Sequence, residues 1–190
     1  FNEDLKGRGG VPDTLVGMLL QAKIPREIPP TRPFLYLPDM GVASSQRKLG
    51  VQNVKLFIMG NKSNAGHCHE DKGSFVFEFA GDTFAMDPGG WNYGEPNHVQ
   101  MRYCQHHNML IPIVSSGVRP HPLNRLPFDI RPIAEGDATR FRATLDVTPG
   151  WKGYYHKWVR TWDSPAPHTL TITDDYELEQ GDGVAFHWIT

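Results

Sequence analysis

The sequence has few cysteines, no long apolar run and no excess of charge of one sign. Its 190 residues hold two cysteines, too few for a disulfide framework, and 19 basic against 21 acidic side chains give a formal charge of −2. Nucleic-acid binding depends on clustered Lys and Arg, and a membrane span needs roughly 18 consecutive apolar residues. We therefore expect neither nucleic acid nor a membrane as partner.

Long helical patterns are also scarce, whereas turn residues and aromatic residues are common. The chain has 19 Gly, 16 Pro, 5 Trp, 6 Tyr and 10 Phe, a composition typical of short strands joined by tight turns. Phe141, Ala143, Leu145 and Val147 alternate with polar residues, and the phenylalanines of 75–79 share one face of their run. Each such strand buries one face. One-sided strands without crossover helices predict an all-β fold, an antiparallel β-sandwich.

Ten short runs are expected to form the strands of this sandwich. They are 34–37, 42–46, 54–59, 73–80, 83–86, 108–114, 140–147, 154–162, 169–173 and 184–189. The last run is apolar and reaches the end of the sequence without a turn residue. It would leave an exposed edge, which native proteins usually cover. We therefore expect a sandwich that is truncated at its C-terminus.

Residues 1–33 have a different character from the rest. Pro12 precedes the only convincing amphipathic helix, with apolar residues at helical spacing from Leu15 to Ala22, and the helix ends before Pro25. Residues 24–33 contain four prolines, a composition typical of a stiff extended linker. We expect a helix and linker over 1–33 and the sandwich over 34–190.

Histidines gather in the middle of the sequence. Five of the nine lie between residues 67 and 107: His67, His69, His98, His106 and His107. His67 and His69 are two apart, so in an extended segment both face one pocket. Imidazoles with a carboxylate suit Zn, Cu, Fe or Ni, and Asp87, just after the run 83–86, is the best-placed carboxylate. A single histidine is more often a surface or hydrogen-bonded residue, so the cluster carries this expectation.

Several residues near the cluster keep more than one interpretation. Glu70 and Asp71 either orient the histidines or are solvated turn residues. Arg140, Arg142 and Arg160 are expected on polar strand faces, where they either meet an acidic sugar or are simply solvated. Cys68 and Cys104 could form one bridge, although nothing requires it.

A His-x-His pair in an all-β chain first suggests a cupin-like metal-dependent enzyme, with an iron site that includes His67. A cupin carries a Glu a few residues after the pair, but Gly73 and Ser74 stand at the positions available here. Glu78 is too far along the chain. The spacing argues against a cupin, which stays the less favoured alternative.

A longer series of motifs runs from residue 67 to residue 108. It has His-Cys-His-Glu-Asp-Lys-Gly-Ser-Phe at 67–75, Asp-Pro-Gly at 87–89, Tyr93, and His-Asn at 107–108. This series resembles the C-terminal β-sandwich of heparinase II/III-like polysaccharide lyases, with His-x-His-x-Asp-x-Gly-Ser-Phe, Asp-x-Gly, a Tyr and Ala-His-Asn. The resemblance covers about residues 34–189 and departs from the pattern at Gln105-His106.

The resemblance implies a specific set of site residues. His69, Asp87 and His107 would bind one zinc ion, which in this family holds the cleft wall rather than activating water. His67 would lie toward the substrate, and Tyr93, with Tyr103 as the competing choice, would approach the sugar. His67 and Tyr93 are therefore the expected catalytic residues, and the role of His106 is left open.

The resemblance also implies a function and a setting. The substrate would be an acidic, uronate-containing polysaccharide such as a glycosaminoglycan, cleaved by β-elimination in the periplasm or outside the cell, although no signal peptide is visible. The main catalytic Tyr, Asn and His would belong to an N-terminal α/α toroid of the same protein, from which residues 1–33 lead out. The alternative from another class is a non-catalytic, metal-stabilised carbohydrate-binding domain.

Overall fold

A computed structural model describes residues 31–62, 68–90, 92–115, 117–122 and 129–190. Within them the regular elements are strands and short 3-10 helices, and residues Arg32–Thr190 form one compact unit. The helix and most of the linker predicted over 1–33 fall outside the described residues. In the part that is described, no helix has the length and apolar character needed to cross a membrane.

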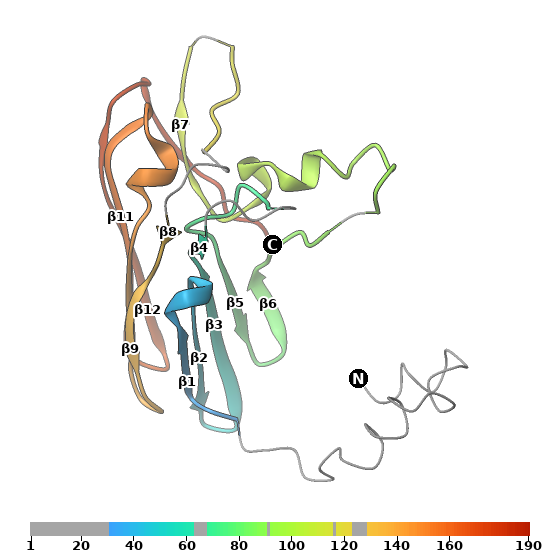
Figure 1. The fold of residues 1–190 in the computed structure, drawn as a ribbon. Coiled ribbons are helices and arrows are strands. Elements are labelled where there is room, and N and C mark those ends of the chain that lie inside the picture. Colours follow the sequence, from blue (N-terminus) through green and yellow to red (C-terminus); the bar gives the residue numbers. More distant parts are fainter. Residues whose placement is uncertain (1–30, 63–67, 91, 116, 123–128) are drawn as a thin grey trace. The chain divides into compact units, whose positions relative to one another are not determined.

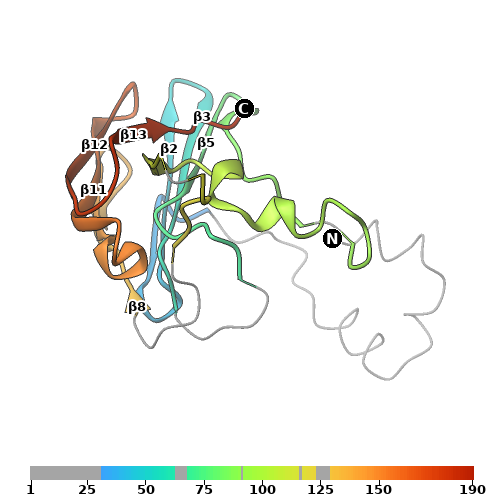
Figure 2. The ribbon, with the colours of Figure 1, turned by 90° about the horizontal axis from the view of Figure 1, so that it is seen from above.

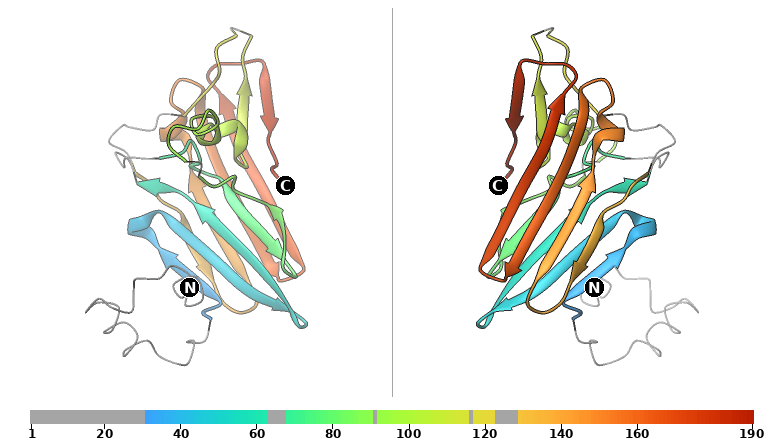
Figure 3. Two further views of the ribbon diagram at one scale, coloured as in Figure 1. Left: turned by 90° about the vertical axis from the view of Figure 1, so that its right-hand side faces the viewer. Right: turned by 90° about the vertical axis from the view of Figure 1, so that its left-hand side faces the viewer.

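Two antiparallel sheets form the two layers of the fold (Figures 1 and 2). The strand order is β1-β2-β3-β5-β6 in the first sheet and β12-β11-β10-β9 in the second, and β7 pairs with β13 and β4 with β8. Figure 3 shows the first sheet in front of the second from one side and behind it from the other. The predicted fold class, an antiparallel all-β sandwich, is confirmed.

The bounds of the elements are as follows. The first sheet contains β1 (Phe34–Leu37), β2 (Val42–Leu49), β3 (Gln52–Met59), β5 (Phe75–Phe79) and β6 (Asp82–Ala85). The second contains β9 (Ile133–Gly136), β10 (Phe141–Asp146), β11 (Tyr155–Ala166) and β12 (Thr169–Leu178). The short ladders use β4 (Asn61–Lys62), β7 (Leu110–Ile113), β8 (Asp129–Ile130) and β13 (Gly183–Phe186). The 3-10 helices are η1 (Pro38–Met40), η2 (Gln100–Arg102), η3 (Cys104–His106) and η4 (Thr148–Trp151).

The buried face of the second sheet follows the alternation of the sequence. Phe141, Ala143, Leu145 and Val147 are at most 1% exposed, whereas the polar residues between them face outward or are half-buried. Trp151, Trp158 and Trp162 fill the same core, so they are packing residues rather than platforms for a sugar. The predicted one-sided burial of this strand is confirmed.

Each of the ten predicted runs overlaps a strand, but some strands differ from the prediction. The short strands β4, β8 and β9 lack a clear apolar alternation, and Ile133 in β9 is 79% exposed. β11 and β12 extend well beyond the predicted 154–162 and 169–173. Two of the added residues are polar and have buried partners: Ser164 accepts a hydrogen bond from Arg47 (2.7 Å), and Asp174 pairs with Arg160.

Arg160 is buried in the core, so the expectation that it lies on a solvated strand face is wrong. Its Nε and Nη2 donate to the two carboxylate oxygens of Asp174 at 2.7 and 2.9 Å. Its Nη1 donates to the carbonyl oxygens of Gly73 (2.8 Å) and Asn108 (2.7 Å). The guanidinium therefore joins the second sheet to two segments of the first layer. Burial is possible because partners surround the charge.

Replacing Asp174 by Asn should strongly destabilise the fold. The Asp174 side chain is 13% exposed and its partner Arg160 is fully buried, so Asp174→Asn leaves an uncompensated buried cation. We expect the free energy of unfolding, measured by urea denaturation, to fall by about 3–5 kcal/mol.

The matched control is Asp163→Asn, whose carboxylate pairs with Arg142 at 3.8 Å while 46% exposed. Exposed pairs of this kind contribute about 0–1 kcal/mol. Equal losses in the two variants would contradict the importance given to the buried pair.

Candidate metal centre

His69, Asp87 and His107 come together from three separate segments. Each offers one ligand atom, and these atoms all lie within 4.8 Å of one another. His107 Nδ1 lies 3.1 Å from Asp87 Oδ2, and the rings of His69 and His107 have their centroids 5.4 Å apart. The structure thus brings together the three residues that the motif series predicts as metal ligands.

The burial of His107 supports a metal ion at this position. The residue is fully buried, and its Nε2 has no hydrogen-bond partner among the residues that the structure describes. A buried polar atom without a partner is costly, and native proteins seldom leave one unsatisfied. Two imidazoles and one carboxylate form a common donor set for divalent transition metals. The donor chemistry and the unpartnered nitrogen therefore both fit a metal ion.

The protonation states of the site residues suit metal binding. Burial lowers the pKa of His69, which favours the neutral imidazole that acts as a ligand. Burial acts to raise the pKa of Asp87, but hydrogen bonds from His107 and from the Gly89 N–H (2.8 Å) outweigh it and hold this pKa below its usual range. Asp87 is therefore available as a carboxylate.

The hydrogen bonds of Asn108 explain why an Asn follows the candidate ligand His107. Its Nδ2 donates to the carbonyl oxygens of Phe75 (2.7 Å) and Met86 (3.1 Å), and its Oδ1 accepts from the Ile189 N–H (2.8 Å). Met86 immediately precedes Asp87, so this one amide fixes the backbone beside two of the three ligands. The sequence pattern points to the His-Asn pair but does not reveal this role of the Asn.

The Gly-Ser-Phe motif sets the turn that leads from His69 into β5. Gly73 has φ +95°, and a Cβ built on it would lie 3.1 Å from Val147 Cγ2, so both its backbone and its surroundings favour glycine. Ser74 Oγ accepts a hydrogen bond from the Asn108 N–H (3.1 Å). Phe75 is fully buried in the core. The motif thus places the segment of His69 against the segment of His107.

Of the other predicted site residues, the structure describes Tyr93, Tyr103 and His106. His67 lies outside the described residues, so its role stays a prediction. Tyr93 is 71% exposed and packs against the His98 ring at a centroid distance of 4.4 Å. Tyr103 is half-buried beneath the Arg119 guanidinium, which lies 3.8 Å from its ring centroid. His106 is exposed and is not one of the three grouped residues.

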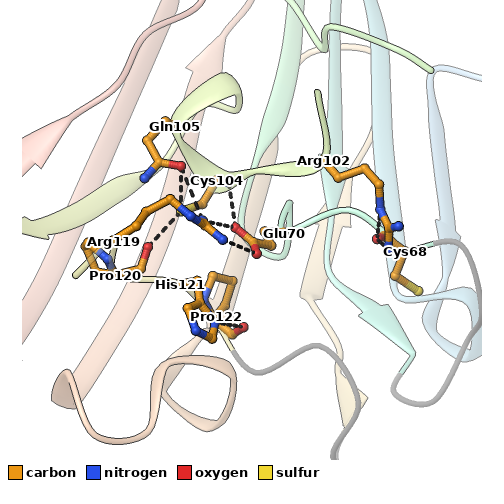
Figure 4. A network of polar contacts seen from close by, with 9 residues as sticks. All are labelled: Cys68, Glu70, Arg102, Cys104, Gln105, Arg119, Pro120, His121 and Pro122. Carbon is orange, nitrogen blue, oxygen red and sulfur yellow. Dashed lines mark hydrogen bonds and ion pairs between the residues drawn. The ribbon is translucent and has the colours of Figure 1, made fainter. Parts of the chain in front are cut away.

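Glu70 and Asp71 are both more buried than solvated turn residues. Glu70 is 7% exposed and binds Arg119 and the Cys104 N–H instead of a histidine (Figure 4). Within the described ranges, Asp71 Oδ1 is buried without a hydrogen-bond partner. Burial raises the pKa of this carboxyl, while the charge of His107 opposes the rise. Nothing in the local sequence around residue 119 indicates that Arg119 contacts this region.

The two cysteines do not form a bridge. Neither Cys68 nor Cys104 takes part in a disulfide bond, and Cys104 is fully buried. Burial, with the nearby charge of Glu70, raises the pKa of the Cys104 thiol to about 12. A thiol with so high a pKa is a packing residue, not a nucleophile.

The comparisons with known proteins agree with this fold. A family model described as "Heparinase II/III-like, C-terminal" matches residues 29–189. Two solved chains described as "Heparinase III-BT4657 gene product", the first with methylated lysines, superpose on the chain with TM-scores of 0.59 and 0.58 respectively. Identity is 14% and 15%, and the match covers 88% of this chain. No curated protein matches the sequence.

The extent of these matches shows which part of the family's proteins this chain corresponds to. The matched region is 25% of each solved heparinase III chain, so this chain spans about a quarter of their length. At such low identity the superposition shows the fold alone, whereas the family model covers most of the sequence. The chain therefore belongs to the heparinase II/III-like family and carries its C-terminal domain.

Proposed function

We propose that this chain is the zinc-binding β-sandwich part of a polysaccharide lyase, which cleaves an acidic, uronate-containing polysaccharide by β-elimination. The observation that carries the proposal is the group of His69, Asp87 and His107, whose ligand atoms lie within 4.8 Å of one another. Membership of the heparinase II/III-like family supports it, as does the similarity of the fold to chains named heparinase III.

The reaction needs more groups than this domain offers. β-Elimination requires a base for the C5 proton, neutralisation of the adjacent carboxylate and an acid for the C4 oxygen. We assign His67 and Tyr93 to the substrate side of the cleft, with Tyr103 as the competing tyrosine. The remaining groups would belong to an N-terminal α/α toroid of the same protein, joined through residues 1–33 to the sandwich of 34–190. The whole enzyme would be periplasmic or secreted.

The chain's own residues would hold the ion as part of the cleft wall. His69, Asp87 and His107 supply the donor atoms, while Asn108 and Ser74 hold the backbone on which these ligands lie. When bound, zinc would supply a fixed positive charge and a rigid link between the three segments, without redox chemistry. Because the net charge of this chain is −2, most of the positive charge that attracts a polyanionic substrate would lie on the toroid.

Zinc should be lost when a ligand is removed. We expect elemental analysis to find about one equivalent of zinc in the purified chain. The zinc content should be far lower in His69→Ala and in Asp87→Asn, because each change removes one of three protein donors. His168→Ala, which alters an exposed histidine outside the group, should keep the ion. Full zinc content in His69→Ala would refute the assigned site.

Chelation should lower the thermal midpoint of the chain. An ion that binds only the folded state stabilises it by about 2.7 kcal/mol at a concentration 100 times the dissociation constant. We expect the midpoint to fall on treatment with a chelator and to recover when zinc is added back. Asp87→Asn should show a low midpoint that the chelator does not change, and an equal chelator effect in this variant would exclude binding at Asp87.

Catalysis should require the second domain. The assay follows the ultraviolet absorbance of the unsaturated uronate product, with heparan sulfate, other glycosaminoglycans or alginate as substrate. We expect no product from the 190-residue chain alone. We expect product from a form in which the chain is joined to the toroid. In the joined form, His67→Ala and Tyr93→Phe should lower kcat by about 10²–10⁴-fold.

His168→Ala is the control in the joined form, because its exposed side chain lies outside the proposed site. Product from the 190-residue chain alone would contradict the proposal that the main catalytic residues lie on the toroid. Polysaccharide binding without cleavage by the joined form would favour the carbohydrate-binding alternative.

A further inference from the structure

The segment that carries His69 lacks strand pairing in the described part of the chain. Residues 68–72 belong to no strand, and β5 begins only at Phe75. The position of His69 must therefore be set by side-chain contacts and isolated backbone hydrogen bonds. Figure 4 shows a network of such contacts around the two neighbours of His69 in the sequence, Cys68 and Glu70.

Both neighbours of His69 are bound to the segment that precedes His107. The Glu70 N–H donates to the Arg102 carbonyl (2.8 Å), and the Arg102 guanidinium donates back to the Cys68 carbonyl at 2.9 and 3.1 Å. The Cys104 N–H donates to Glu70 Oε2 at 2.9 Å. The two segments that carry the histidine ligands are thus joined directly, on both sides of His69.

Arg119 binds the Glu70 carboxylate from a third segment. Its Nη1 lies 2.5 Å from Oε2 and its Nη2 lies 3.0 Å from Oε1, a bidentate arrangement of charge-assisted hydrogen bonds. The Glu70 side chain is 9% exposed and that of Arg119 31%, so solvent screens this pair less than a surface pair. The guanidinium also lies over the Tyr103 ring, at 3.8 Å from its centroid.

We propose that Glu70 and Arg119 are positioning residues for the metal centre, fixing the His69 segment against residues 102–104 so that both imidazoles reach one ion. This inference rests on the proposed function of the site as a metal centre. The pair acts through the backbone on either side of His69. Without the Arg119 charge, the Glu70 carboxylate is a poorly compensated buried anion, and the acceptor that fixes the Cys104 N–H is no longer held.

The test measures metal affinity in the full 190-residue chain, with Co²⁺ as the probe. We expect Glu70→Gln and Arg119→Gln each to raise the dissociation constant by about 10–100-fold, the effect of losing groups that orient metal ligands. The dissociation constant of the double variant should be no higher than that of the weaker-binding single variant, because both changes break the same pair. At saturating Co²⁺, the visible ligand-field spectrum of the single variants should differ from that of the unchanged chain.

Matched controls separate this effect from a general loss of stability. Glu78→Gln breaks the pair of Glu78 with Lys55, and Arg142→Gln breaks the pair of Arg142 with Asp163, both on the sheets. Both controls should keep the affinity and the spectrum. Arg119→Lys keeps the charge but loses the bidentate geometry, so it should be folded and show a smaller loss of affinity, which keeps the test informative if Arg119→Gln unfolds.

The possible outcomes distinguish the two proposals. An unchanged chain that binds neither Co²⁺ nor Zn²⁺ refutes the proposed metal function, and with it the inference drawn from that function. Tight binding by the unchanged chain, with affinity and spectrum preserved in Glu70→Gln and Arg119→Lys, overturns the positioning role alone. Additive losses in the double variant also overturn it, because they would show that the two residues act separately.

Discussion

The buried guanidinium of Arg160 is the interaction on which the arrangement of this domain depends. A cation removed from water costs several kcal/mol unless its donors are all engaged, and here the partners come from three places: Asp174 on β12, and the carbonyls of Gly73 and Asn108 in the other layer. These contacts favour one register between the two layers. Because Gly73 and Asn108 lie near His69 and next to His107, the geometry of the candidate metal centre depends on the packing of the sheets.

Local patterns in the sequence predict most of the fold and the ligand set. The alternation over 141–147 shows which face is buried, because side chains on a strand alternate with a period of two, and the structure confirms it. The order and spacing of the motifs are recognisable, so they indicate the three candidate metal ligands His69, Asp87 and His107. Such features are visible without knowing which strands lie side by side.

Contacts between distant segments could not be predicted in this way. The polarity of Arg160 suggests a polar face, although alternation puts it on the same face as Trp158 and Trp162. Its partner Asp174 lies on the neighbouring strand and makes the buried position stable. Glu70 and Arg119 are 49 positions apart, with the strands β5, β6 and β7 and two 3-10 helices between them. Only the folded arrangement shows that these charges meet, and for the same reason the role of Asn108 was not apparent.

The hydrogen bonds of Ile189 bear on the order in which the domain is assembled. Its N–H binds the Asn108 side chain, 81 positions earlier, and its carbonyl binds the Met86 N–H beside Asp87. During synthesis all three ligands emerge from the ribosome long before this residue does. Contacts of such long sequence separation form late, since the chain must close a large loop before they stabilise it. The group of His69, Asp87 and His107 is therefore among the last parts of the domain to take its final form.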